Sequence, residues 1–145
     1  MEGKVKNYKY AELMSKLKTS IENNFYYESI FIEYAILEDR TTSLLKHSKL
    51  GTLDINGEEL TVNGKLNKIK HSKEFYADEY VKEHITKELL SDIYNWKNRR
   101  NALIHNLVET KYNNEDIKNI ALDGYELIKL LNSKSTLINK YFDKK

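Results

Sequence analysis

Residues 80–108, which read YVKEHITKELLSDIYNWKNRRNALIHNLV, carry the clearest helical pattern of the chain. Apolar residues recur there at the three- and four-residue spacing that marks one face of an α-helix. They are Ile85, Leu89, Ile93, Trp96, Leu103 and Leu107. The pattern predicts one long amphipathic helix that buries this stripe against the rest of the chain.

Three other main helices are predicted around this segment. The first covers about residues 10–21, and the second covers about residues 27–45 and stops before Gly51, a residue suited to the left-handed position after a helix. The last begins with Asn114 as its cap and gives way to a ragged, lysine-rich tail after Leu131. The residues expected to face inward are Tyr10, Leu13, Met14, Leu17 and Ile21 in the first helix, Tyr27, Ile30, Phe31, Tyr34, Leu37, Thr41, Leu44 and Leu45 in the second, and Ile117, Ile120, Ala121, Leu127, Ile128 and Leu131 in the last.

Residues 51–64 break the helical pattern. Apolar residues alternate with polar ones on both sides of Asn56-Gly57, which is typical of a β-hairpin. Because a two-stranded ribbon is marginal by itself, we expect it to lean on a helical body. The sequence therefore predicts an all-α fold over residues 1–145: a single domain, built as a four-helix bundle with a small β-hairpin insertion between the second and third main helices.

The composition fits one such domain and excludes several classes of function. With 145 residues and 40% apolar content, the chain suffices for one core but not for two independent domains. Lysine and arginine number 24 against 22 aspartate and glutamate, so the net charge of +2 gives no strong field toward nucleic acid or an anionic membrane. There is no cysteine, and no apolar stretch has the length of a signal peptide or a membrane span. We therefore expect a soluble, cytoplasmic protein without thiol chemistry and without a membrane partner.

Two neighbouring arginines in the segment Trp96–Asn106 have different predicted surroundings. At 100° per residue, Arg100 lies within the apolar stripe, whereas Arg99 lies on a polar face. A guanidinium on an apolar stripe carries a desolvation cost unless it is paired. Arg100 is therefore expected to meet an anion or another subunit, or, in the purely structural alternative, a core carboxylate.

Asn101 and His105 lie one helical turn apart and form a polar seam beside this stripe. On a straight helix, Arg100 and His105 stand about 140° apart. They converge only if the arginine arm wraps round, the helix breaks, or a second copy contributes. Histidine exchanges a proton near neutral pH and arginine grips phosphate with a permanently charged planar fork, so the pair suits phosphodiester chemistry without metal. In the structural alternative His105 is merely a half-buried helix histidine.

The run Arg100-Asn101-Ala102-Leu103-Ile104-His105 resembles the signature of the HEPN superfamily (higher eukaryotes and prokaryotes nucleotide-binding domains). In that family an arginine precedes a histidine by a gap of four to six residues, and a polar residue frequently follows the arginine. Arg40 and His47 also match the bare pattern, but Thr41 follows Arg40, so the asparagine is found only after Arg100. The resemblance implies a helical fold that covers most of residues 8–131, with the hairpin as a departure from it.

The resemblance also implies an activity. Many HEPN proteins are metal-independent RNA endonucleases of toxin–antitoxin, antiviral and abortive-infection systems, and they work as dimers whose two motifs face one another. Carried over, His105 would act on the proton of the ribose 2′-hydroxyl or of the leaving oxygen, Arg100 would stabilise charge on the phosphoryl oxygens, and Asn101 would orient the histidine or the phosphate. The products would be a 2′,3′-cyclic phosphate and a 5′-hydroxyl.

The partners implied are an RNA substrate, a second copy that completes the active site at the interface and, in a toxin–antitoxin system, an antitoxin. No cofactor is implied. The alternative function is a non-catalytic HEPN-type module that uses Arg100 to hold a nucleotide or a partner protein.

The remaining charged and aromatic residues are expected to be structural. The charged clusters are Glu33, Glu38, Asp39 and Arg40 on the second helix, and Lys65, Lys68, Lys70 and Lys73 after the hairpin. Both are interpreted as solvated faces, with Glu38 as a possible partner of Arg40 or Arg100. Tyrosines such as Tyr26, Tyr27, Tyr76, Tyr80 and Tyr94 are interpreted as core-edge residues rather than base-stacking platforms. No metal site is expected, because His47, His71 and His84 lack metal-ligand spacing.

Overall fold

The computed structural model describes residues 2–109 and 112–145, with side chains from residue 8 onward. Over these residues the structure contains six α-helices, one 3₁₀ turn and no strand. The helices are α1 (Glu2–Glu22), α2 (Tyr26–His47), α3 (Val62–Lys70), α4 (Glu79–His84), α5 (Lys87–His105) and α6 (Asn114–Asp143), and the 3₁₀ turn η1 covers Phe75–Ala77. The predicted all-α fold is confirmed.

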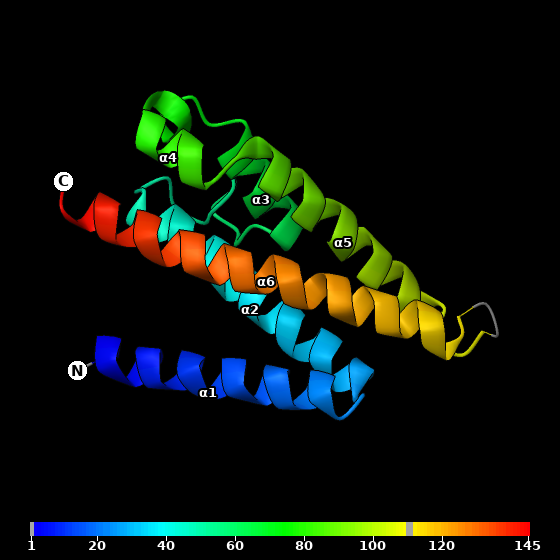
Figure 1. Cartoon of the computed structure of the whole chain (residues 1–145). Helices are drawn as coiled ribbons and strands as arrows, with labels where there is room; N and C mark the ends of the chain where they lie inside the picture. Colours follow the sequence, from blue (N-terminus) through cyan, green and yellow to red (C-terminus); the bar gives the residue numbers. More distant parts are fainter. Residues whose placement is uncertain (1, 110–111) are drawn as a thin grey trace.

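Helices α2 and α6 form the central pair of the fold and lie side by side over much of their length (Figure 1). Helix α1 packs on α2 as the other arm of a helical hairpin, and α5 packs on α6. The short α3 contacts both α2 and α5, and α4 packs near the C-terminal end of α6. Helix α5, which carries the Arg100–His105 motif, is therefore held between α3 and α6.

Helices α2, α5 and α6 meet at a buried contact between Glu33, Trp96 and Gly124. The indole Nε1 of Trp96 donates a 2.8 Å hydrogen bond to the carbonyl oxygen of Ile120, and Trp96 is 2% exposed. A Cβ atom at position 124 would come within 3.0 Å of both the Glu33 carboxyl and the Trp96 ring, so only glycine lets α6 approach this closely. This contact fixes the rotation of α5 and thereby the direction in which the motif residues point.

The predicted β-hairpin over residues 51–64 is wrong. Leu53 and Glu59 form one isolated antiparallel bridge, and no strand extends from it within the described residues. The Asp54 carboxylate accepts hydrogen bonds from two backbone N–H groups of the loop, and Gly57 adopts a left-handed φ of 79°. These local interactions draw the segment into a tight turn instead of extended strands.

The second half of the predicted hairpin is the start of a helix. Thr61 caps α3, because its Oγ1 accepts a 3.1 Å hydrogen bond from the backbone N–H of Gly64. Val62, Leu66 and Ile69 then form the buried face of α3. The alternation of Leu60 and Val62 predicts a strand, but the helical spacing of Val62 to Leu66 decides the structure.

The predicted single helix over residues 80–108 is in fact two helices. The helix is interrupted at the buried residue Ile85. Thr86 then caps α5, because its side chain accepts a 3.0 Å hydrogen bond from the backbone N–H of Leu89. The apolar stripe continues across this interruption, so the periodicity of the sequence does not reveal where one helix ends and the next begins. Helix α5 also ends at His105, which leaves Leu107 49% exposed rather than buried.

The last helix is longer than predicted. Its cap is Asn113 rather than Asn114, and Asn113 and Asp116 form a reciprocal capping box. The predicted ragged tail after Leu131 is helical to Asp143. The buried residues beyond Leu131 that support it are Ser135, Ile138 and Asn139.

Helix α2 buries most of its predicted face. The buried members are Ile30, Leu37, Thr41, Leu44 and Leu45. Tyr27 and Phe31 were also predicted to face inward, but they are 52% and 72% exposed. The first turns of α2 therefore present uncovered aromatic side chains.

Candidate active site

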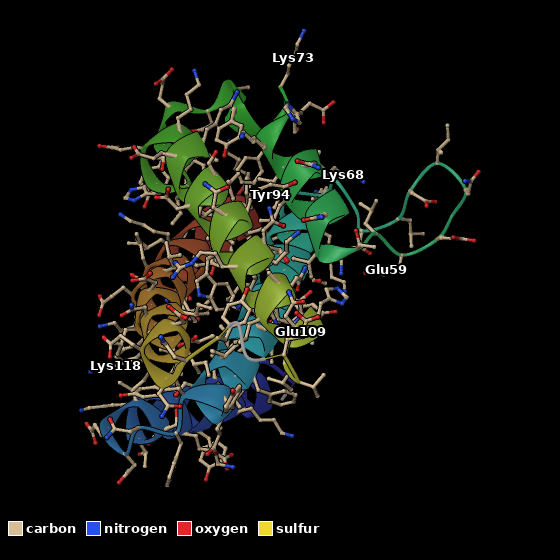
Figure 2. All side chains as sticks on the ribbon, turned by 90° about the vertical axis from the view of Figure 1, so that its right-hand side faces the viewer. Glu59, Lys68, Lys73, Tyr94, Glu109 and Lys118 are labelled. Carbon is tan, nitrogen blue, oxygen red and sulfur yellow. The ribbon has the colours of Figure 1, made fainter. Side chains whose placement is uncertain are left out.

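Arg100, Asn101 and His105 lie in the last turns of α5. This end of α5 lies at the end of the molecule that faces the viewer in Figure 2, where Glu109 is labelled just beyond the helix. Because α5 is an unbroken helix from Lys87 to His105, Arg100 and His105 keep their angular separation of about 140°.

Arg100 is half-buried and is held by uncharged groups. Its Cζ lies 3.8 Å from the centroid of the Tyr34 ring on α2, and one Nη donates a 3.0 Å hydrogen bond to Oδ1 of Asn101. Its Nε is buried and has no acceptor within the described part of the chain. No carboxylate of the described residues pairs with Arg100, so the alternative of a core ion pair is not what the structure shows. The guanidinium charge is therefore oriented but not neutralised.

His105 is separated from Arg100 within one chain. It is the last residue of α5, its side chain is exposed, and it makes no hydrogen bond or ion pair with any residue that the structure describes. Asn101 lies one turn before it and is half-buried. The fold thus brings Arg100 and Asn101 together and leaves His105 exposed at the surface.

Arg99 has the surroundings that its helical position predicts. Its Nη1 forms a 2.7 Å ion pair with Asp123 on α6, and both side chains are about half exposed. Such an exposed pair contributes little to stability. The two adjacent arginines lie on different sides of α5, one toward α6 and one toward α2.

Glu33 is a buried acid that the sequence interpretation missed. It is 0% exposed, and neither carboxyl oxygen has a hydrogen-bond partner in the described residues. Burial, and secondly the charge of Asp123, raises the pKa of Glu33 to about 10. The group is therefore protonated at neutral pH. The sequence does carry a signal for this burial: Glu33 lies at helical spacing from Ile30 and Leu37, which are both buried, and this spacing indicates the inner face of α2.

The predicted solvated faces also contain buried cations. Arg40 is 7% exposed, pairs with Asp39 at 3.0 Å and lies 4.1 Å from the ring centroid of Tyr10. Lys65 is 4% exposed and forms a 3.0 Å ion pair with Glu59. For these residues the predicted solvation is wrong, and neither Arg40 nor Arg100 pairs with Glu38 in the structure.

Lysines of α3 form hydrogen bonds and an ion pair with the loop that precedes this helix. Figure 2 shows Glu59 and Lys68 near the base of the projecting loop. Lys68 donates to the carbonyl oxygens of Gly51 and Leu53 at 3.0 and 3.4 Å. These contacts give the basic run a structural role, and the interpretation as a purely solvated face is wrong for Lys68 too.

Lys97 is a further buried cation, on α5 itself. It is 2% exposed, donates to Oδ1 of Asn63 on α3 and lies 4.7 Å from the ring centroid of Tyr94. Burial lowers the pKa of Lys97. Nothing in the apolar stripe singles out this lysine, because its burial depends on α3 packing against α5.

Neither a metal cluster nor a membrane span is found in the described parts of the chain. No group of three or more histidine, cysteine, aspartate or glutamate side chains there could hold a metal ion. None of the helices described is both long and apolar enough to cross a bilayer. Compared with protein-family models, with curated proteins and with solved structures, the chain has no significant match to any of the three. The resemblance to HEPN domains therefore rests on the motif.

Proposed function

We propose that this protein is a HEPN-type, metal-independent endoribonuclease of a toxin–antitoxin or antiviral defence system. The observation that carries the proposal is the state of Arg100: a half-buried guanidinium stacked on Tyr34, held by Asn101 and paired with no described carboxylate. Keeping a cation partly desolvated and unneutralised is costly unless an anion binds it. The phosphodiester of RNA supplies such an anion, and the fork of arginine fits its oxygens.

The proposed reaction is an internal transfer at phosphorus. His105 takes the proton of the ribose 2′-hydroxyl, and the 2′-oxygen attacks the adjacent phosphorus. The bond to the 5′-oxygen breaks, and this oxygen receives a proton as it leaves. Arg100 stabilises the charge that gathers on the phosphoryl oxygens, while Asn101 holds Arg100 in place. The products are a 2′,3′-cyclic phosphate and a 5′-hydroxyl, and the reaction consumes neither water nor a metal.

The separation of Arg100 from His105 supports a homodimer with a composite site. A two-fold axis beside the end of α5 would place His105 of one copy opposite Arg100 of the other. Apolar side chains are exposed at the end of α5 and in the first turns of α2: Ile104 and Val108 are 45% and 95% exposed, and Phe31 is 72% exposed. Uncovered apolar residues of this kind are typical of protein interfaces.

The same separation also favours the rival function, a non-catalytic module that binds a nucleotide or a partner protein through Arg100. A monomer in which His105 is exposed and lies apart from Arg100 would bind an anion without cleaving it. The two functions differ in one observable. The module leaves every RNA intact, whereas the nuclease cleaves.

The proposal is tested by incubating the purified protein with labelled single-stranded RNA in EDTA. We expect cleavage to persist in EDTA, and Arg100→Ala to lower the rate at least about 100-fold, because charge stabilisation at phosphorus is lost. Lys82→Ala is the control: it removes an exposed cation on α4 that pairs with Glu79 at 3.3 Å and lies outside the motif, and it should leave the rate near that of the unaltered protein. Equal losses in both variants, or cleavage that EDTA abolishes, would contradict the proposal.

A further inference from the structure

A pocket opens between α5 and α6, on the face where Arg99 lies. It has a volume of about 420 Å³ and is lined by Asn98, Arg99, Ala102, Tyr112, Asn119 and Ile120, with Asp116 beside them. A volume of this size lies in the range of small-molecule sites. A second hollow of about 400 Å³ adjoins it at Arg99.

The chemistry of this α5–α6 pocket suits a flat, heteroaromatic ring. Ala102 and Ile120 give it apolar surface, and Tyr112 adds an aromatic ring. The amides of Asn98 on α5 and Asn119 on α6 are exposed and make no hydrogen bond with the described residues. A side-chain amide offers a donor and an acceptor side by side, which matches the edge of a nucleobase, while apolar and aromatic surfaces match its face.

The charges around the pocket favour the base rather than a phosphate. Arg99 is neutralised by Asp123 at 2.7 Å, and the Asp116 carboxylate adds a negative charge. Among the lining residues that the structure describes, there is therefore no free cation to hold a phosphate, in contrast to the surroundings of Arg100. A neutral ring enters such a site without an electrostatic penalty.

The pocket lies next to the proposed site along α5. Asn98, Ala102 and His105 are spaced by four and three residues, so they share one stripe of the helix. We infer that the α5–α6 pocket binds one unstacked nucleobase of the RNA strand whose phosphate lies near His105. The identity of the strand rests on the proposed function, whereas the choice of a nucleobase rests on the pocket alone. A free nucleotide carries the same nucleobase, and the experiment distinguishes a base within an RNA strand from the base of a free nucleotide.

The test measures binding of a fluorescent single-stranded oligoribonucleotide whose 2′-hydroxyls are methylated, so that no cleavage intervenes. Asn98→Leu and Asn119→Leu each remove one amide at an exposed position. Asn67→Leu makes the same change at an exposed position on α3 and serves as the control. Each variant is compared with the unaltered protein by fluorescence anisotropy, with thermal unfolding followed by circular dichroism, and with an abasic strand of the same length.

We expect both pocket variants to bind the base-bearing strand about tenfold more weakly, in line with the loss of one base-edge contact. Asn67→Leu should bind this strand normally, and all proteins should bind the abasic strand alike. Unchanged affinity in both pocket variants, or equal losses for the abasic strand, would overturn the inference. Displacement of the strand by micromolar nucleoside monophosphates, lost in both variants, would assign the pocket to a free nucleotide and overturn the assignment to a strand. Base-dependent binding without cleavage of any natural RNA would overturn the proposed nuclease while leaving the pocket intact.

Discussion

His105→Ala is expected to abolish RNA cleavage, with a rate about 1,000-fold below that of the unaltered protein and an unchanged helical content. The chemical reason is that His105 is the member of the motif whose side chain type exchanges protons near neutral pH. The fold should not respond, because the imidazole is exposed and makes no hydrogen bond with the described residues. Initial rates on labelled RNA in EDTA give the first quantity, and far-ultraviolet circular dichroism gives the second.

His71→Ala is the matched control for this variant. His71 is an exposed histidine that follows α3 and lies outside the motif, so its removal should leave the rate unchanged. Cleavage retained in His105→Ala would place the chemistry elsewhere in the protein. A parallel loss in His71→Ala would show that the effect does not depend on the motif.

Glu33→Gln is expected to stabilise the protein at pH 7 by up to about 3 kcal/mol and to remove most of the pH dependence of unfolding that this residue causes. In the folded chain, burial first and Asp123 second raise the pKa of Glu33 from 4.5 to about 10. The native state therefore keeps a proton that the unfolded state loses. The stability that Glu33 contributes is fully present below pH 4.5 and is lost, by about 1.4 kcal/mol per pH unit, as the pH rises toward the folded-state pKa.

Urea unfolding at pH 5, 7 and 9, followed by the fluorescence of the only tryptophan, Trp96, measures this effect. Glutamine has nearly the shape of a protonated glutamate but does not ionise, so the two proteins should converge in acid. Glu38→Gln, at an exposed position of the same helix, should leave the stability profile unchanged. A Glu33→Gln protein that is less stable than its parent at pH 7 would show that the carboxyl is ionised and paired in the fold.

Periodicity predicted the helices well where one face of a segment meets the core along its whole length. Leu44 and Ile93, among others, are buried as their spacing requires. It failed where a single side chain redirects the backbone. Asp54 closes the loop for which the alternating pattern predicts a hairpin, and Thr86 starts a new helix inside an uninterrupted apolar stripe. Local hydrogen bonds of this kind compete with the pattern and are not visible in it.

The sequence predicts those features of the candidate site that depend on the geometry of a single helix. The contrast between Arg99 and Arg100 follows from their angular positions on α5, and the structure places them toward α6 and α2 accordingly. The stacking of Arg100 on Tyr34 depends on how two helices meet. The α5–α6 pocket likewise joins Asn98 to Asn119, which are brought together only by packing. Such juxtapositions carry no signature in the spacing of either helix.

The composite site is tested most directly by mixing the two inactive variants, Arg100→Ala and His105→Ala, after partial unfolding to exchange subunits. If Arg100 of one copy acts with His105 of the other, each mixed dimer contains one intact site. Half of the dimers are mixed at random reassortment, so EDTA-resistant cleavage should return to about a quarter of the unaltered rate. A mixture as inactive as either variant alone, although mixed dimers have formed, would contradict the proposed site.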